Sequence, residues 1–174
     1  MTSQSTQLHR REAAKLPMVA VAVITISDTR TEETDESGKL VRQLLEAAGH
    51  RVDVYTILKD EPDMISAEVR RLTAEGAVQA IITNGGTGIA PRDGTFEAVS
   101  GLLQRELPGF GEIFRMLSYH EVGAAAMLSR AVAGLRGKTF IFCIPGSANA
   151  VRVAMEKLIV PELAHLVWEA NRRA

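Results

Sequence analysis

The sequence predicts an α/β fold: a three-layer α/β/α sandwich whose sheet is mostly parallel, with one antiparallel strand. Strand-like apolar runs alternate along the chain with segments in which apolar residues recur at helical spacing, an order typical of parallel sheets covered by helices. Late in the chain, the apolar runs 131–135 and 139–144 are joined only by Arg136-Gly137-Lys138. So short a connection predicts an antiparallel hairpin.

In the first half of the chain, two strand patterns are each followed by a helix pattern. Residues 19–26 are continuously apolar and β-branched, which suits a strand buried on both faces. The alternation at 52–56 indicates a more exposed strand. The other expected elements are a loop at 27–37, a helix through 40–48 that stops at Gly49, a loop at 59–63 and, after Pro62, a helix through 64–72 that ends near Gly76.

The second half begins with a buried strand at 78–82 that runs directly into a glycine-rich loop. Pro108-Gly109 separates two helix patterns. In order, we expect a helix carrying Phe96, Val99, Leu102 and Leu103, a helix from Phe110 to Leu117, the hairpin, a helix carrying Val151 to Leu158, and a last helix that Pro161 opens and that ends near Asn171.

The composition fits one domain. The chain has 174 residues, of which 46% are hydrophobic, and a formal net charge of -1, so it can bury a core and lacks the basic footprint of a nucleic-acid-binding protein. We expect a disordered N-terminal tail over 1–17 and a single domain over 18–174. The apolar run 18–26 superficially resembles part of a secretory signal but lacks a small-x-small cleavage pattern. No apolar run approaches the roughly 20 residues that span a bilayer, so no membrane partner is expected.

Cysteine and histidine positions argue against several common site types. Cys143 is the sole cysteine and lies in an apolar run, which predicts a buried, inert thiol and fits a reducing, cytoplasmic compartment. The histidines have no metal-ligand spacing, so no zinc site is expected, and neither flavin nor haem is expected. The absence of a Gly-x-Ser-x-Gly elbow leaves a Ser-His-Asp hydrolase unsupported.

The strongest local signal is Thr83-Asn84-Gly85-Gly86-Thr87-Gly88, directly after a buried strand. Glycines there allow positive φ and close approach to a ligand, and successive N–H groups in such a turn form an anion cradle. An ordinary glycine turn is the alternative. The P-loop motif is excluded because no lysine follows, and Gly-x-Gly-x-x-Gly is excluded by its spacing.

Asp60 and Asp93 are expected beside this loop. Each comes just before a helix pattern, so each could be a helix N-cap or first-turn carboxylate. Both nevertheless fall at the carboxyl end of the sheet, where open α/β sheets bind ligands, and two carboxylates that face phosphates usually need Mg²⁺ between them. The loops that begin at Ser27, Lys59, Asn84 and Pro145 leave that edge and should converge on one cleft. For Ser27 and Ser147 the local alternatives are turn chemistry and an N-cap.

Several motifs occur in the order found in one family. They are Val21–Asp28, Asp35–Gly38, Leu58–Glu61, Ile82–Gly88, Pro91–Asp93, Pro108–Glu112, Met127–Arg130 and Ile144–Ser147. On these motifs the chain resembles, over roughly Val19 to Leu166, the MoaB/MogA family of molybdenum cofactor biosynthesis proteins, which is related to the G domains of gephyrin and its plant counterpart.

The resemblance implies transfer of an adenylyl group from Mg-ATP to the terminal phosphate of molybdopterin, with release of pyrophosphate. It implies that Asp60 and Asp93 are the catalytic aspartates and that they organise Mg²⁺, while Gly85, Gly86, Thr87 and Gly88 hold phosphates. The other implied substrate-binding residues are Ser27, Asp28, Thr83, Ser129, Pro145, Gly146 and Ser147.

The resemblance leaves the question of turnover open. Segments 115–118 and 130–135 look more like the MoaB branch, in which some members are inactive and carry changed carboxylates at the two aspartate positions. This chain keeps both aspartates, which favours an enzyme; a protein that binds molybdopterin or a nucleotide without turnover is the alternative. Lys59 replaces a proline common in the family. The family implies a trimer or hexamer, with 110–128 as interface material, and a molybdenum insertase partner. A gephyrin-like scaffold is disfavoured because no long linker or second domain is evident.

Overall fold

The computed structural model describes residues 18–171, and within them six strands form one sheet in the order β2-β1-β3-β6-β5-β4. The strands are β1 (Ala20–Ile26), β2 (Arg51–Leu58), β3 (Ala80–Asn84), β4 (Arg105–Glu106), β5 (Val132–Arg136) and β6 (Thr139–Ile144). Strands β2, β1, β3 and β6 pair in parallel, whereas β5 runs antiparallel to both of its neighbours. The predicted α/β fold with one antiparallel strand is confirmed. The expected tail over 1–17 lies outside the described residues.

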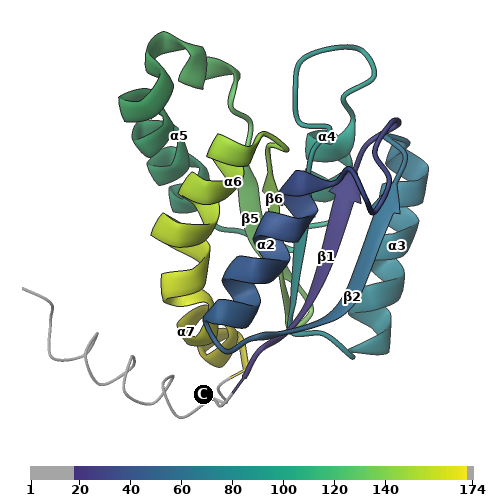
Figure 1. Cartoon of the computed structure of the whole chain (residues 1–174). Helices are drawn as coiled ribbons and strands as arrows, with labels where there is room; N and C mark the ends of the chain where they lie inside the picture. Colours follow the sequence, from purple (N-terminus) through teal and green to yellow (C-terminus); the bar gives the residue numbers. More distant parts are fainter. Residues whose placement is uncertain (1–17, 172–174) are drawn as a thin grey trace, which may run out of the picture.

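Helices cover both faces of the sheet (Figure 1). One layer contains α2 (Glu36–Ala47), α5 (Pro108–Val122), α6 (Ala148–Ala154) and α7 (Val160–Asn171), and the other contains α3 (Pro62–Glu75) and α4 (Thr95–Ser100). Side chains of β1 alternate between the layers: Val21 and Val23 pack into the first, Ala22 and Ile24 into the second. All four are fully buried, as expected for a strand covered on both faces.

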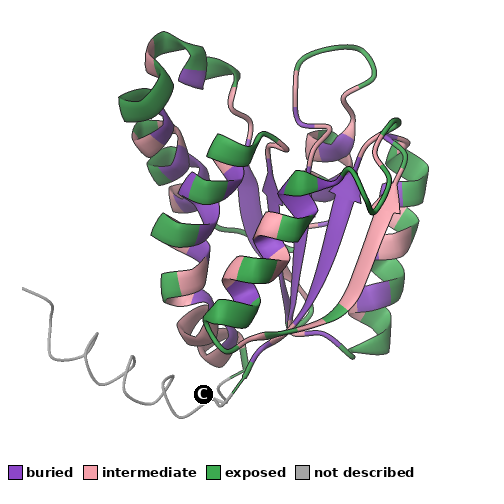
Figure 2. Ribbon diagram, in the orientation of Figure 1, coloured by how far each residue is buried: buried purple, intermediate pink, exposed green. Residues whose placement is uncertain are grey.

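The edge strand and the helix ends follow the sequence pattern. Strand β2 lies at one edge of the sheet and is partly exposed along its length, whereas β1 is almost wholly buried (Figure 2). Pro62 is the first residue of α3, where its missing N–H costs no helical hydrogen bond. Gly76 ends that helix with a φ of 65°, a left-handed conformation that glycine adopts without strain.

The segment after the glycine-rich loop differs from the expected one. Helix α4 ends at Ser100, so Leu102 and Leu103 follow it rather than belong to it, although both still pack into the same core as α4. A strand that the sequence does not signal, β4, pairs with the outer edge of β5. Its residues are exposed Arg105 and Glu106, and two polar residues show no strand periodicity.

The two helices expected at the end of the chain are joined by a π-helical turn. This turn, η2 (Met155–Ile159), lies between α6 and α7, and the Val160 N–H donates to the Met155 carbonyl. Pro161 has no N–H to bond to the preceding turn, and a wider π turn is a common way for a helix to absorb such a break. No helix in the described part of the chain is both long and apolar enough to cross a membrane.

Candidate functional site

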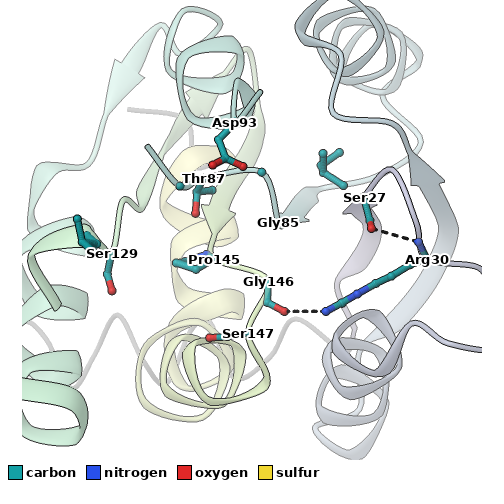
Figure 3. Close-up of a pocket in the computed structure, with 13 residues that line it drawn as sticks. Ser27, Arg30, Gly85, Thr87, Asp93, Ser129, Pro145, Gly146 and Ser147 are labelled. Carbon is teal, nitrogen blue, oxygen red and sulfur yellow. Dashed lines mark hydrogen bonds between the residues drawn. The ribbon is translucent and has the colours of Figure 1, made fainter. Parts of the chain in front are cut away.

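Loops at the carboxyl ends of β1, β3 and β6 surround a cleft of about 400 Å³ (Figure 3). Its lining residues are Ile26, Ser27, Arg30, Gly85, Gly86, Thr87, Gly88, Asp93, Leu128, Ser129, Pro145, Gly146 and Ser147. Three of the four loops that were expected to converge therefore do so. The fourth lies alongside: Lys59 lines a neighbouring hollow of about 440 Å³, and Asp60 lies behind the glycine loop, next to Gly86.

The glycine loop needs its glycines for conformation and for space. Gly85 and Gly86 have φ values of 107° and 61°, which L side chains rarely adopt. A Cβ atom on Gly85 would strike the Ile26 carbonyl, and one on Gly86 would strike the side chains of Asp60 and Thr95. The loop is thus more constrained than an ordinary solvent-exposed turn.

The predicted anion cradle has fewer free N–H donors than the glycine loop has residues, because one of these N–H groups bonds within the protein. The Gly85 N–H donates to the Ile144 carbonyl at 3.1 Å, which ties β3 to β6 at the edge of the cleft. The next three residues, Gly86, Thr87 and Gly88, line the cleft, and within residues 18–171 their N–H groups have no acceptor. Three consecutive donors therefore remain for an anion.

Two predicted substrate-binding residues lie away from this cleft. Thr83 is fully buried in β3, which ends at Asn84 rather than Ile82, and its hydroxyl donates to the Phe142 carbonyl (3.4 Å). Asp28 lines the neighbouring hollow, where its Oδ2 pairs with Arg92 Nε at 3.0 Å. The predicted residues that do line the cleft are Ser27, Gly85, Gly86, Thr87, Gly88, Ser129, Pro145, Gly146 and Ser147.

Both serines at the strand ends also have the local roles that were left open. The Ser147 hydroxyl oxygen accepts a hydrogen bond from the Ala150 N–H at 3.2 Å and caps α6. The Ser27 oxygen accepts from the N–H groups of Thr29 (3.3 Å) and Arg30 (3.2 Å), which shapes the turn after β1. Neither role removes these residues from the cleft wall.

Asp60 is a buried carboxylate that bonds to the start of a helix distant in sequence. The residue is 7% exposed, and its Oδ1 accepts from the Gly94 N–H (3.2 Å) and the Thr95 hydroxyl (3.4 Å) at the beginning of α4. The N-cap of the helix that follows Asp60 is Glu61, without a side-chain hydrogen bond. The N-cap interpretation is therefore wrong for the adjoining helix; the carboxylate instead joins two loops at the edge of the sheet.

Asp93 lines the cleft and closes the loop after Gly88. Its Oδ2 accepts from the Ala90 N–H at 3.0 Å and lies where a Cβ atom on Gly88 would be. The N-cap of α4 is Gly94, with no side-chain capping bond. Asp93 thus shapes its own turn rather than capping the helix, and its carboxylate stays at the cleft wall.

The carboxylate of Asp60 responds to its burial and to two neighbouring carboxylates. Burial raises the pKa of Asp60, and the negative charges of Asp93 and Asp28 raise it further, while its two hydrogen bonds oppose the shift. The Arg92 guanidinium lowers the pKa of the Asp28 carboxyl. Within residues 18–171, no cluster of three or more Asp, Glu, His or Cys side chains could hold a metal ion by itself. Since Mg²⁺ usually binds through one or two carboxylates together with substrate phosphates, the site fits a metal that arrives with its ligand.

Arg130 holds the glycine loop through two of its carbonyl groups, a role that no sequence pattern indicated. Its Nε donates to the Thr87 carbonyl at 2.9 Å, and its Nη2 donates to the Gly88 carbonyl. The guanidinium also pairs with Glu97 and stacks 4.9 Å from the centre of the Phe96 ring. In a planar trans peptide the C=O and the following N–H point in opposite directions, so holding the Thr87 carbonyl directs the Gly88 N–H away from Arg130.

A buried polar network supports the cleft on the side of β1, and it too was not predicted. Asp35, fully buried, is the N-cap of α2 and accepts from the Gly38 N–H at 2.9 Å. It also accepts from the hydroxyls of Thr25 and Tyr55. Burial raises the pKa of Asp35, but these hydrogen bonds outweigh it and hold the pKa below its usual value. The carboxylate is therefore held in its charged form beneath the cleft.

Comparison with known proteins places these observations in context. Residues 22–165 match the protein family described as "Probable molybdopterin binding domain". Molybdenum cofactor biosynthesis protein B of Bacillus subtilis is 53% identical over 169 residues, which make up 97% of this chain and 98% of that protein. The family match begins within β1 and ends within α7, so it spans the whole sheet and every loop of the cleft.

Solved structures agree with the sequence comparison. A crystal structure of molybdenum cofactor biosynthesis protein B is 52% identical, with a TM-score of 0.87, and the match covers 90% of this chain and 98% of the other. The tungsten cofactor synthesizing protein MoaB from Pyrococcus furiosus is 35% identical, with a TM-score of 0.80 and coverage of 89% and 98%. Similarity in both sequence and fold thus extends over nearly the full length of these proteins.

Proposed function

The chain belongs to this family of molybdopterin-binding domains, as a MoaB-type protein of molybdenum cofactor biosynthesis, and we propose that it adenylylates molybdopterin. The proposed reaction transfers the adenylyl group of Mg-ATP to the terminal phosphate of molybdopterin and releases pyrophosphate. One observation carries the proposal: three N–H groups of the glycine loop that have no acceptor among residues 18–171 adjoin the carboxylates of Asp60 and Asp93. Phosphate donors and metal-binding carboxylates at one site are the parts that phosphoryl-type transfer requires.

In the proposed reaction, an oxygen of the molybdopterin phosphate attacks the α-phosphorus of ATP. A P–O bond forms there while the bond from the α-phosphorus to the bridging oxygen breaks, and pyrophosphate leaves with the bonding electron pair. The N–H groups of Gly86, Thr87 and Gly88 would hold phosphate oxygens and keep the two reactants aligned. Such positioning supplies most of the catalysis in reactions of this kind.

Asp60 and Asp93 are the residues that would hold Mg²⁺, together with phosphate oxygens of the ligands. When bound, the metal would neutralise phosphate charge and stabilise the leaving pyrophosphate. Burial is the main cause of the raised pKa of Asp60, and the negative charges of Asp93 and Asp28 add to it. A divalent cation would relieve that repulsion, which supports the assignment.

A protein that binds molybdopterin or a nucleotide without turnover is the second candidate, and one observation favours it. The carboxylates of Asp60 and Asp93 accept from the N–H groups of Gly94 (3.2 Å) and Ala90 (3.0 Å). Both aspartates therefore have a structural use that requires no metal. This candidate predicts saturable molybdopterin binding without release of pyrophosphate.

The decisive experiment incubates the protein with molybdopterin, ATP and Mg²⁺ and measures adenylylated pterin by mass spectrometry and pyrophosphate by a coupled assay. We expect product from the wild type and at least about a 100-fold lower rate from Asp60→Asn and Asp93→Asn, in keeping with the size of transition-state electrostatic effects. Asp53→Asn is the matched control, because Asp53 pairs with Arg51 on the exposed edge of the sheet. Binding without product selects the second candidate, and absence of molybdopterin binding rejects both.

The proposal includes a homo-oligomer, a trimer or a hexamer. Helix α5 and the 3-10 helix η1 (Gly123–Leu128) carry exposed apolar side chains. They are Ile113, Met116, Tyr119, Val122, Met127 and Leu128. Clustered apolar side chains of this kind are typical of interfaces. Sedimentation that finds only monomer would contradict this part of the proposal.

We also propose that the product passes to a molybdenum insertase and that the protein acts in the cytoplasm. The chain has a single cysteine, the buried Cys143, and therefore no intramolecular disulfide that an oxidising compartment would have to form, which fits a reducing compartment. Co-purification of an insertase with the tagged protein from cytoplasmic extract tests both statements.

A further inference from the structure

Arg30 is the cationic side chain in the wall of the cleft, and Asp93 is the anionic one. The Arg30 side chain extends from the loop after β1 toward the loop after β6, where its Nη2 donates to the Gly146 carbonyl at 3.4 Å (Figure 3). Its Nη1 donates to Asp35 Oδ1 (3.2 Å) and to the Ser37 hydroxyl. A guanidinium has five N–H donors, so the Nε–H and one Nη2–H have no acceptor within the described part of the chain.

We propose that Arg30 binds a phosphate oxygen of the ligand in the cleft and that Asp35 is the buried residue that positions it. The inference rests on the proposed function in one respect, that the cleft accepts a phosphorylated ligand. A planar guanidinium matches phosphate through paired N–H donors. Arg30 and Gly86 to Gly88 line the same cleft, so the guanidinium and the loop N–H groups can contact one phosphorylated ligand.

Asp35 can position Arg30 because its own place is determined by three elements. Its carboxylate accepts from the Thr25 hydroxyl in β1 (2.5 Å), the Tyr55 hydroxyl in β2 (2.7 Å) and the Gly38 N–H in α2 (2.9 Å). The Asp35 side chain is 0% exposed, whereas that of Arg30 is 34% exposed. One partner is therefore buried and held by several hydrogen bonds while the other is partly open to the cleft, which is the arrangement expected of a positioning residue.

Arg30 also offsets the negative charge of Asp93 in the lining of the cleft. Without it, Asp93 would be the charged residue of the wall, and it would repel phosphate. Asp35 already accepts hydrogen bonds from three hydroxyls and a backbone N–H, so its burial does not depend on Arg30 alone. The ion pair therefore contributes more to the position of Arg30 than to the burial of Asp35.

Inorganic pyrophosphate is the probe, titrated calorimetrically without Mg²⁺ or molybdopterin into the full-length protein. We expect Arg30→Gln to weaken its binding by at least about ten-fold, as loss of a charged bidentate contact does. Arg30→Lys keeps the positive charge but loses the paired N–H donors of the guanidinium. Its affinity for pyrophosphate should lie between those of Arg30→Gln and the wild type. Asp35→Asn should weaken binding several-fold while Arg30 itself is retained.

The Asp35→Asn variant is designed to fold. Its Oδ1 keeps the contacts with Arg30 and the Gly38 N–H, and the new Nδ2 faces the hydroxyls of Thr25 and Tyr55, which can turn and accept. Asp53→Asn is the matched control, because the same substitution there removes a carboxylate that pairs with Arg51 on the exposed edge of the sheet. It should bind pyrophosphate within about two-fold of the wild type, and circular dichroism checks that each variant is folded.

A double-mutant cycle separates positioning from a merely structural effect. If Asp35 acts through Arg30, adding Asp35→Asn to Arg30→Gln weakens binding no further. An additional loss in the double variant overturns the role of Asp35. Equal binding by Arg30→Gln and the wild type, or no binding by the wild type at millimolar pyrophosphate, overturns the role of Arg30. Failure of the proposed function gives a different result: pyrophosphate binding that depends on Arg30, with no adenylylated pterin.

Discussion

Gly86→Ala should destabilise the protein through two separable effects. The φ of Gly86 is 61°, and a left-handed conformation costs an L-residue roughly 1–2 kcal/mol. The added Cβ would also strike the Thr95 hydroxyl and the Asp60 carboxylate, and such crowding in a packed region costs about 1–3 kcal/mol. The expected loss in the free energy of unfolding is therefore roughly 2–5 kcal/mol.

Gly137→Ala isolates the backbone contribution. Gly137, in the turn of the β5–β6 hairpin, also has a φ of 61°, but no atom lies within 4 Å of the Cβ position. It should lose only the roughly 1–2 kcal/mol of the left-handed conformation. The difference between the two variants then measures the crowding at Gly86 alone.

Urea unfolding followed by circular dichroism gives both free energies, and thermal unfolding gives a second estimate at about 2–4 °C per kcal/mol for a chain of this size. If Gly86→Ala loses no more stability than Gly137→Ala, the close packing of Asp60 and Thr95 against the loop is wrong. A loss of pyrophosphate binding in Gly86→Ala but not in Gly137→Ala would add that this packing shapes the cleft.

Three further outcomes are expected. Because the folded pKa of Asp60 is raised, folding favours its protonated form; Asp60→Asn should gain stability relative to the wild type as pH rises through that pKa, and a pH-independent difference in urea unfolding would contradict this. Arg130→Gln should lose about 2 kcal/mol of unfolding free energy, because two loop carbonyls lose charged donors, whereas Arg71→Gln at an exposed ion pair on α3 should lose less than about 1 kcal/mol; equal losses in urea unfolding would argue against the loop contacts. Cys143, whose pKa burial raises to about 12, should resist iodoacetamide at pH 8 unless urea is present, and rapid labelling of the native protein in mass spectra would place the thiol elsewhere.

The fold was predictable where local chemistry and burial act together. The run that became β1 is apolar at every position because both faces are covered, and the short turn at Gly137 could only join antiparallel neighbours. Strand β4 was not predictable, because two exposed polar residues are held in place by their pairing with β5 and not by their own preference. Tertiary pairing of that kind leaves no local pattern.

The position of the cleft was predictable from the sequence, but the side-chain contacts that shape it were not. The expectation that loops at the carboxyl ends of the strands meet agrees with the structure for Ser27, the glycine loop and the Pro145 loop, which line one cleft. Arg130 was missed because its carbonyl partner at Thr87 lies 43 residues away in sequence. Thr83 lies outside the cleft because β3 continues to Asn84, and a strand boundary decides whether a side chain enters the sheet or a loop.

The hydrogen bonds of Asp60 determine which substitution can test its proposed catalytic role. Alanine at position 60 would remove the acceptor for the Gly94 N–H and the Thr95 hydroxyl, and the loop beside Gly86 would lose its support whether or not a metal ever binds there. A loss of activity in such a variant would fit both an enzyme and a pure binder with a damaged cleft. Asparagine keeps an acceptor oxygen for these hydrogen bonds and removes the charged carboxylate that we propose binds Mg²⁺. Because Asp60 also holds the loop through its hydrogen bonds, loss of activity alone does not show a catalytic role. A variant that still binds molybdopterin but forms no product would show one.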